Sequence, residues 1–122
     1  MSEKKAKNVI VVDDEESVME LIGGYLKTIG FRLFTFTDPK EALAFIIDTE
    51  EEIHLLVTDY NMPKTNGTIL MQEMRVMSPG LKTVCISGRQ RDEIDGVEEF
   101  DGFLEKPFLL SKLRSLIENL LQ

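Results

Sequence analysis

The chain has 122 residues, 43% of them hydrophobic, and a formal net charge of −8 from 22 acidic and 14 basic residues. This length is typical of one domain that buries its own core without stabilising disulfide bonds or structural metal ions. The acidic balance argues against sequence-independent binding of nucleic acid, which requires a basic face.

The chain has a single cysteine, Cys85, so no internal disulfide can form. Because Cys85 lies in the apolar stretch 81–86, we interpret it as a buried, inert thiol.

The N-terminus does not resemble a signal peptide. Lys4, Lys5 and Lys7 precede only four apolar residues, Val9–Val12, too few for a signal-peptide core. No apolar run approaches the roughly 18 residues of a membrane span. We therefore expect a cytoplasmic protein that does not bind a membrane.

The first half of the chain predicts two strand–helix units. Residues 1–7 are polar and predicted to be disordered, with the domain spanning 8–122. Val9–Val12 and Phe31–Thr37 predict strands, and Asp38-Pro39 is a strong start signal for a helix that continues to about Asp48. Between the strands, a helix over 15–29 is indicated by apolar residues at helical spacing, namely Val18, Leu21, Ile22, Tyr25, Leu26 and Ile29.

The second half continues the alternation. A central apolar strand, 53–59, ends at Asp59, and two further strands are predicted at 81–87 and 103–104. A helix follows Asn66-Gly67, marked by Ile69, Leu70, Met74 and Met77, and a last one covers 109–121. The pattern predicts an α/β fold, a five-stranded parallel sheet with helices on both faces.

Polar residues stand at the carboxyl ends of four predicted strands: Asp13-Asp14, Asp59, Ser87 and Lys106. Singly, each has an ordinary explanation as a helix cap, a turn residue or a solvated lysine. In a parallel sheet, however, these strand ends share one edge, where open α/β sheets bind ligands. We therefore interpret them as one site.

The charges of this site predict a metal and a reaction. Two carboxylates about 4 Å apart repel by about 4 kcal/mol at an effective dielectric of about 20. A lysine and a divalent cation would balance three carboxylates, and oxygen ligands without His or Cys favour Mg²⁺. A carboxylate nucleophile beside Mg²⁺, a hydroxyl and an ammonium suits phosphoryl transfer. Asp59 is the predicted nucleophile because it stands alone on the central strand.

Together, Val11-Val12-Asp13-Asp14-Glu15, Asp59-Tyr60-Asn61-Met62-Pro63, Asn66-Gly67, Ile86-Ser87-Gly88 and Phe103-Leu104-Glu105-Lys106-Pro107-Phe108 resemble the receiver domain of two-component response regulators. The resemblance spans about residues 8–121. It implies the (βα)5 flavodoxin-like receiver fold and a phosphorelay function. It also implies a protein that catalyses only its own phosphoryl transfer and dephosphorylation.

For individual residues, the resemblance implies that Asp59 accepts a phosphoryl group from a histidine kinase or histidine phosphotransfer protein. It implies Mg²⁺ held by Asp14 and Asp59, by Asp13 largely through water, and by the Asn61 backbone carbonyl. Ser87 would bond the phosphoryl group, beside Lys106. Two further expectations come with it: Phe103 as the switch aromatic, and a cis peptide bond between Lys106 and Pro107.

Three features depart from the usual pattern. Phe103 has no hydroxyl, so any switching there must work through packing. Only 19 positions separate Ser87 from Lys106, so the fourth helix is expected to be trimmed. Nothing follows the last helix, which indicates a single-domain regulator or a receiver excised from a longer protein, whose downstream partner is an unknown protein rather than nucleic acid.

Two other functions stay open. A Mg²⁺-dependent phosphohydrolase with an aspartyl nucleophile usually has a second carboxylate two residues later, where this chain has Asn61. A receiver-like binding module that is never phosphorylated would not need Asp59, Ser87 and Lys106. His54 precedes a buried strand, and we interpret it as a strand-edge residue rather than a phosphohistidine.

Overall fold

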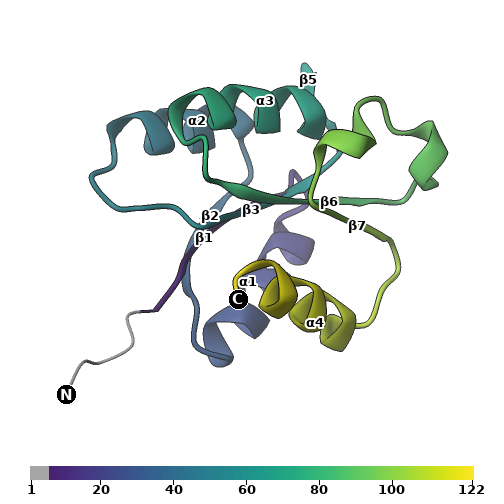
Figure 1. Ribbon diagram of the computed structural model, residues 1–122. Coiled ribbons are helices and arrows are strands. Elements are labelled where there is room, and N and C mark those ends of the chain that lie inside the picture. Colours follow the sequence, from purple (N-terminus) through teal and green to yellow (C-terminus); the bar gives the residue numbers. More distant parts are fainter. Residues whose placement is uncertain (1–5) are drawn as a thin grey trace.

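A computed structural model describes residues 6–122 of the chain (Figure 1). The predicted disordered tail, 1–7, therefore lies mostly outside the described residues. Within them, the Lys7 backbone carbonyl already accepts a hydrogen bond from the Arg32 N–H at 2.9 Å. Regular structure begins directly afterwards, at Asn8.

Five parallel strands form the predicted sheet. They are β1 (Asn8–Val12), β2 (Arg32–Phe36), β3 (Leu55–Asp59), β6 (Lys82–Ser87) and β7 (Gly102–Glu105). Their order is β2-β1-β3-β6-β7, so β1 and β3 are neighbours in the middle. Every residue of β1 and β3 is buried, which explains why both strands are apolar without alternation.

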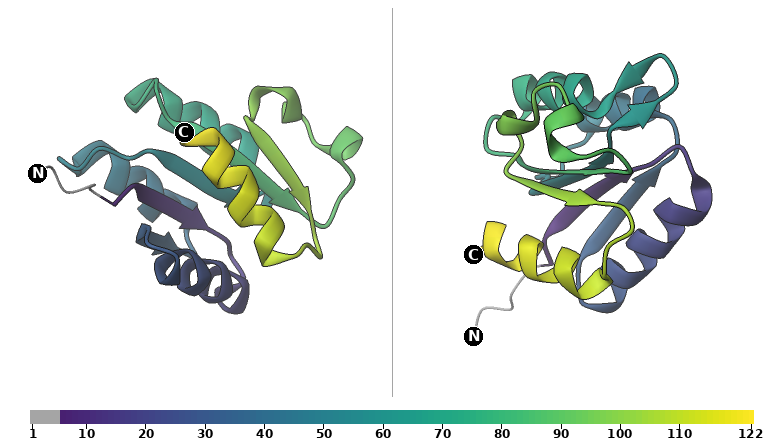
Figure 2. Two further views of the ribbon diagram at one scale, coloured as in Figure 1. Left: turned by 60° about the horizontal axis from the view of Figure 1, so that its bottom comes forward. Right: turned by 90° about the vertical axis from the view of Figure 1, so that its right-hand side faces the viewer.

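Four helices cover the two faces of the sheet (Figures 1 and 2). Helices α2 (Pro39–Asp48) and α3 (Gly67–Met77) lie on one face, and α1 (Glu16–Thr28) and α4 (Leu110–Leu120) on the other. The start of α2 follows its sequence signal, since the Asp38 side chain accepts the Lys40 N–H and Pro39 is the first helical residue. None of the described helices has the length and apolar character needed to cross a membrane.

The inward faces of two helices differ from the prediction. Leu21 of α1 is 60% exposed, and Ile69 and Met77 of α3 are 45% and 49% exposed. The prediction is confirmed for Ile22 and Leu26 in α1 and for Leu70 and Met74 in α3, which are buried. The core also takes Met19 and Met71, which the predicted stripes left out. The buried face of each helix is therefore displaced from the predicted stripe, because packing against the sheet sets its limits.

The connection between β6 and β7 contains no α-helix. Two 3-10 helices, Arg91–Glu93 and Val97–Glu99, stand in its place, which confirms the trimmed fourth helix and leaves the described chain with four α-helices rather than five. Ile94, Val97 and Phe100 are buried and attach this connection to the core under α3.

Arg75 fastens the far end of the same connection. Its guanidinium donates hydrogen bonds to the Asp101 carboxylate at 2.9 Å, to the Thr83 hydroxyl at 3.0 Å and to the Glu99 carbonyl. Asp101 also accepts the Thr83 N–H at 2.8 Å. One arginine thus joins α3, β6 and the start of β7, where an ordinary crossover helix would supply packing.

A small hairpin that the sequence did not predict follows β3. Strands β4 (Asn61–Met62) and β5 (Thr65–Asn66) pair antiparallel around a two-residue turn. At its base, the Gly67 N–H donates to the Tyr60 carbonyl at 2.8 Å. A Cβ at Gly67 would lie 2.5 Å from the Asp59 carbonyl oxygen, so only glycine allows the backbone to approach this closely.

Candidate functional site

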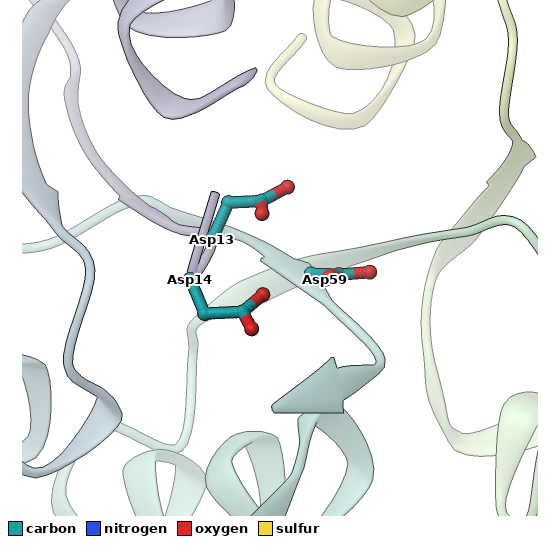
Figure 3. Close-up of side chains that lie close together, drawn as sticks. All are labelled: Asp13, Asp14 and Asp59. Carbon is teal, nitrogen blue, oxygen red and sulfur yellow. The ribbon is translucent and has the colours of Figure 1, made fainter. Parts of the chain in front are cut away.

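Three carboxylates converge where the strand order of the sheet reverses (Figure 3). Asp13 and Asp14 directly follow β1, and Asp59 is the last residue of β3, the strand beside it. Each offers an oxygen within 4.8 Å of the others. Asp13 is fully buried and Asp59 is 6% exposed, whereas Asp14 is open to solvent. The predicted acidic cluster is therefore present at the predicted edge.

Lys106 joins the cluster from the end of β7, the edge strand next to β6. Its Nζ lies 3.1 Å from Asp13 Oδ2 and 3.6 Å from Asp59 Oδ1. The residue follows β7, and its backbone N–H donates to the Ser87 carbonyl at 2.7 Å, which holds it against the end of β6. The Lys106–Pro107 peptide bond is cis, as predicted.

Ser87 ends β6, the strand that pairs with β3, and it is fully buried. Its neighbour Ile86 pairs with Asp59 in the register, and the Ile86 carbonyl accepts the Tyr60 N–H at 3.0 Å. The Ser87 hydroxyl oxygen accepts the Arg89 N–H at 3.0 Å. Because that bond uses a lone pair, the hydroxyl hydrogen is still available for donation to a ligand.

The environment of Asp59 disfavours its charge. Burial and the nearby Asp13 carboxylate raise the pKa of Asp59 from 3.8 to about 6, with a smaller contribution from Asp14. The Lys106 ammonium and the Tyr60 N–H, which donates to Asp59 Oδ1 at 2.9 Å, act in the opposite direction. When all three are ionised, the carboxylates carry more negative charge than Lys106 balances.

Burial lowers the pKa of Lys106, but the hydrogen bond and charge of Asp13, together with Asp59 and Glu15, outweigh it and leave the pKa above its usual value. Lys106 is therefore a fixed cation at neutral pH. Both oxygens of Asp13 have a partner, since the second oxygen accepts the Glu15 N–H at 2.9 Å.

Asp14, in contrast, makes no hydrogen bond within residues 6–122 and is free to bind a cation directly. Asn61 opens the hairpin after Asp59 at the same edge.

Three residues that the sequence singled out lie away from the carboxylates or beneath them. Phe103 is half-buried on β7 and packs against the core cluster under α2 and α3. Cys85 is buried in that cluster, and burial raises the pKa of its thiol to about 12, as expected for an inert cysteine. His54 directly precedes β3, and its Nδ1 accepts the Asn8 N–H at 3.0 Å. This confirms the interpretation of His54 as a strand-edge residue.

Sequence reasoning missed a cleft of about 600 Å³ beside Asp14. It lies between the start of α2 and the β4–β5 hairpin, and its lining includes Lys40, Lys64 and Glu73. The hairpin that forms one side of this cleft had one signal in the sequence, Pro63, because proline favours the first central position of a β-turn. Strands β4 and β5 themselves gave no signal, because two residues are too few to show periodicity.

Comparison with known proteins adds family information. A family model described as "Response regulator receiver domain" matches residues 9–118. Among curated proteins, the chain is 35% identical over 119 residues to the probable transcriptional regulator ycf27 of Cyanophora paradoxa, and 30% identical over 119 residues to the sensor kinase CckA of Brucella abortus. The matches cover 95% and 93% of this chain but only 48% and 12% of those proteins.

Among solved structures, the response regulator protein TrrA of Thermotoga maritima, in complex with Mg(2+)-BeF, is 25% identical with a TM-score of 0.82. That match covers 94% of this chain and 99% of the other. The match thus covers nearly all of that solved chain, whereas the present chain spans half or less of the two curated proteins.

Proposed function

Since the chain belongs to the response regulator receiver domain family of two-component systems, we propose that Asp59 accepts a phosphoryl group from a phosphohistidine. The observation that carries the proposal is the position of this nearly buried carboxylate, beside an acidic pair and the Lys106 ammonium. The donor would be a histidine kinase or a histidine phosphotransfer protein.

In the proposed reaction, an Asp59 carboxylate oxygen attacks the phosphorus atom of the donor. The new oxygen–phosphorus bond forms as the nitrogen–phosphorus bond breaks. The histidine, protonated on its other ring nitrogen, leaves as neutral imidazole with the bonding electron pair. Lys106 lies within reach of the phosphoryl oxygens, and the Ser87 hydroxyl hydrogen can be donated to one of them. Such fixed donors stabilise charge that is spread over the transferring group.

The donor set fits Mg²⁺. Three carboxylates and a backbone carbonyl are hard oxygen ligands. The pKa of Asp59 is raised by burial first and by the Asp13 carboxylate second, and a divalent cation would relieve that repulsion. Asp14 and Asp59 would bind the ion directly, with the Asn61 carbonyl. Asp13 would act largely through water, since both its oxygens already have partners. When bound, the ion would neutralise charge on the transferring phosphoryl group.

The descriptions of two relatives agree with the proposal. TrrA is described in complex with Mg(2+)-BeF, and CckA is described as a sensor kinase. Because the chain spans only part of ycf27 and CckA, the activities of those whole proteins do not transfer. For this chain we propose a receiver domain over 8–122 in the cytoplasm, whose phosphorylation is read by a protein partner through the surface around Phe103.

The two alternative functions have specific weaknesses. A phosphohydrolase would favour a carboxylate at position 61, where the chain has Asn61. A binding module that is never phosphorylated would have no use for a lysine held 3.6 Å from Asp59. A turnover assay with small phosphomonoesters separates the first alternative, because a receiver should release almost no phosphate from them.

Intact-mass measurement after incubation with acetyl phosphate and Mg²⁺ tests the main proposal. The wild type should gain one phosphoryl group, and Asp59→Asn should gain none, because an amide is not a nucleophile of this kind. Asp48→Asn, an exposed site at the end of α2, is the matched control and should behave as the wild type. An unchanged mass gain in Asp59→Asn would refute the assignment.

A further inference from the structure

Helix α3 exposes two aliphatic side chains on one side. Val76 is 79% exposed and Ile69 is 45% exposed. Seven positions separate them, which is nearly two full helical turns, so both lie on the same side of the helix, about 10 Å apart. Gln72 and Glu73, three and four positions after Ile69, lie between them. We call the surface formed by these four residues the outer face of α3.

The β6–β7 connection lies along one edge of this outer face, on the same side of the sheet as α3 (Figure 1). The Thr68 hydroxyl donates a hydrogen bond to the Asp95 carbonyl, and the Gln72 amide donates one to the Glu99 carboxylate at 2.9 Å. Together with the bonds of Arg75, these contacts fix the connection beside the helix. They nevertheless leave the two aliphatic side chains uncovered.

The connection is strongly acidic. Positions 88–101 contain six acidic residues and two basic ones, so this short stretch carries half of the chain's net charge of −8. Of the six acids, only Asp101 has a cationic partner within residues 6–122, namely Arg75.

Carboxylates therefore border the aliphatic pair on both sides. Glu99 lies on the side of Gln72, to which it is hydrogen-bonded. Glu73 lies on the other side of the line from Ile69 to Val76, is exposed, and makes no ion pair among the described residues. The surface combines an exposed apolar strip with negative charge that no neighbouring cation balances.

The sign of this charge determines which class of partner fits. Nucleic acids and anionic membrane surfaces are themselves negative, so these carboxylates would repel them. A protein segment that carries both apolar and basic side chains matches the strip and its acidic borders at once.

We propose that the outer face of α3 and the acidic connection bind a basic amphipathic helix of a partner protein. Apolar side chains of that helix would pack on Ile69 and Val76, and its lysine or arginine side chains would face Glu73 on one side and Glu99 on the other. A helix fits because the two aliphatic groups are aligned along α3, and helices that cross at about 20° stay in contact over this distance. This surface is separate from the one around Phe103.

The probe for the first test is a synthetic helical peptide of leucine, lysine and alanine, with its leucines on one side. A second peptide has glutamate in place of lysine. Fluorescence anisotropy at low ionic strength should show binding of the basic peptide only. Val76→Ser should weaken this binding at least about fivefold, because it removes a central apolar contact. Glu98→Gln should weaken it about two- to threefold, because it removes one charge of the connection, and this loss should vanish at about 0.5 M salt.

Leu21→Ser and Glu20→Gln are the matched controls. Leu21 is 60% exposed, Glu20 is also exposed, and both belong to α1, which covers the opposite face of the sheet. Neither change should alter the binding of the basic peptide. If these controls lose as much affinity as the variants at positions 76 and 98, if the acidic peptide binds equally well, or if neither peptide binds, the proposal is wrong.

Amide NMR signals locate the contact directly. Titration with the basic peptide should shift the signals of residues 69, 72, 73 and 76 and of residues 95–99, and should leave those of α1 unchanged. Shifts that miss α3 overturn the proposal. Vesicles of phosphatidylglycerol should cause no shifts, and shifts of the α3 signals by vesicles would identify a membrane surface as the partner instead. Asp59→Asn should bind the peptide like the wild type, so a failure of the proposed phosphoryl transfer would leave this inference standing.

Discussion

Replacing Asp59 with asparagine should stabilise the metal-free protein, although it removes the proposed phosphoacceptor. Asparagine keeps the size of the side chain and can still accept the Tyr60 N–H that Asp59 accepts at 2.9 Å. Lys106 keeps its closer partner, Asp13, at 3.1 Å. What the substitution removes is a charge held in a nearly buried position beside another carboxylate.

The size of the effect follows from the pKa of Asp59, which burial and Asp13 raise from 3.8 to about 6. A carboxyl group with a raised pKa binds its proton more tightly in the folded than in the unfolded chain. Its contribution to stability is therefore complete below about pH 3.8 and is lost as the pH rises through about 6. At about 1.4 kcal/mol per pKa unit, ionisation of Asp59 costs about 3 kcal/mol above pH 7 and about 1 kcal/mol near pH 4.5.

Urea denaturation at pH 4.5 and pH 8, without divalent ions, measures the difference. Asp59→Asn should exceed the wild type by about 3 kcal/mol at the higher pH and by about 1 kcal/mol at the lower. Adding Mg²⁺ should stabilise the wild type more than the variant, because the variant lacks one ligand charge. Asp48→Asn controls for a generic loss of negative charge. A stability gain that is the same at both pH values would show that electrostatic strain at Asp59 is not its source.

Three further predictions concern other parts of the molecule. Asp14→Ala should weaken Mg²⁺ binding at least tenfold in a calorimetric titration, since it removes the exposed ligand charge, and equal affinity would count against its role. Arg75→Ala should lower the free energy of unfolding by about 2 kcal/mol in urea, because it removes the hydrogen bonds to Thr83 and the Glu99 carbonyl and leaves the Asp101 carboxylate without its cation. Mg²⁺ affinity should not change, and an unchanged stability would contradict the role described for Arg75. Phe103 should keep inward ring contacts by NMR even before beryllofluoride and Mg²⁺ are added, because it is already half-buried against the core; a ring that contacts the core only after their addition would refute this.

Local signals in the sequence were sufficient for most of the fold. Asp38 and Pro39 mark the start of α2 because the cap and the fixed proline φ act within one turn. The buried strands β1 and β3 are recognisable because a parallel sheet covered on both faces has no polar side to interrupt the apolar run.

Features that depend on residues far away in the sequence were harder to predict. Leu21 and Ile69 satisfy the helical spacing, yet each lies at the margin of its stripe, and only the neighbouring elements determine that they face solvent. Strand ends could place the site residues on one edge of the sheet. They could not indicate that both oxygens of Asp13 are engaged, because one partner, Lys106, is 93 positions away.

The closed base of the β4–β5 hairpin has a consequence for how this protein can vary. The Gly67 N–H and the Tyr60 carbonyl close the base of the loop with a hydrogen bond at 2.8 Å. The Asp59 backbone lies directly against Gly67. The tip residues, Pro63 and Lys64, are exposed. Substitutions or short insertions at the tip can therefore accumulate without displacing the reactive residue, whereas a single methyl group at position 67 cannot be accommodated.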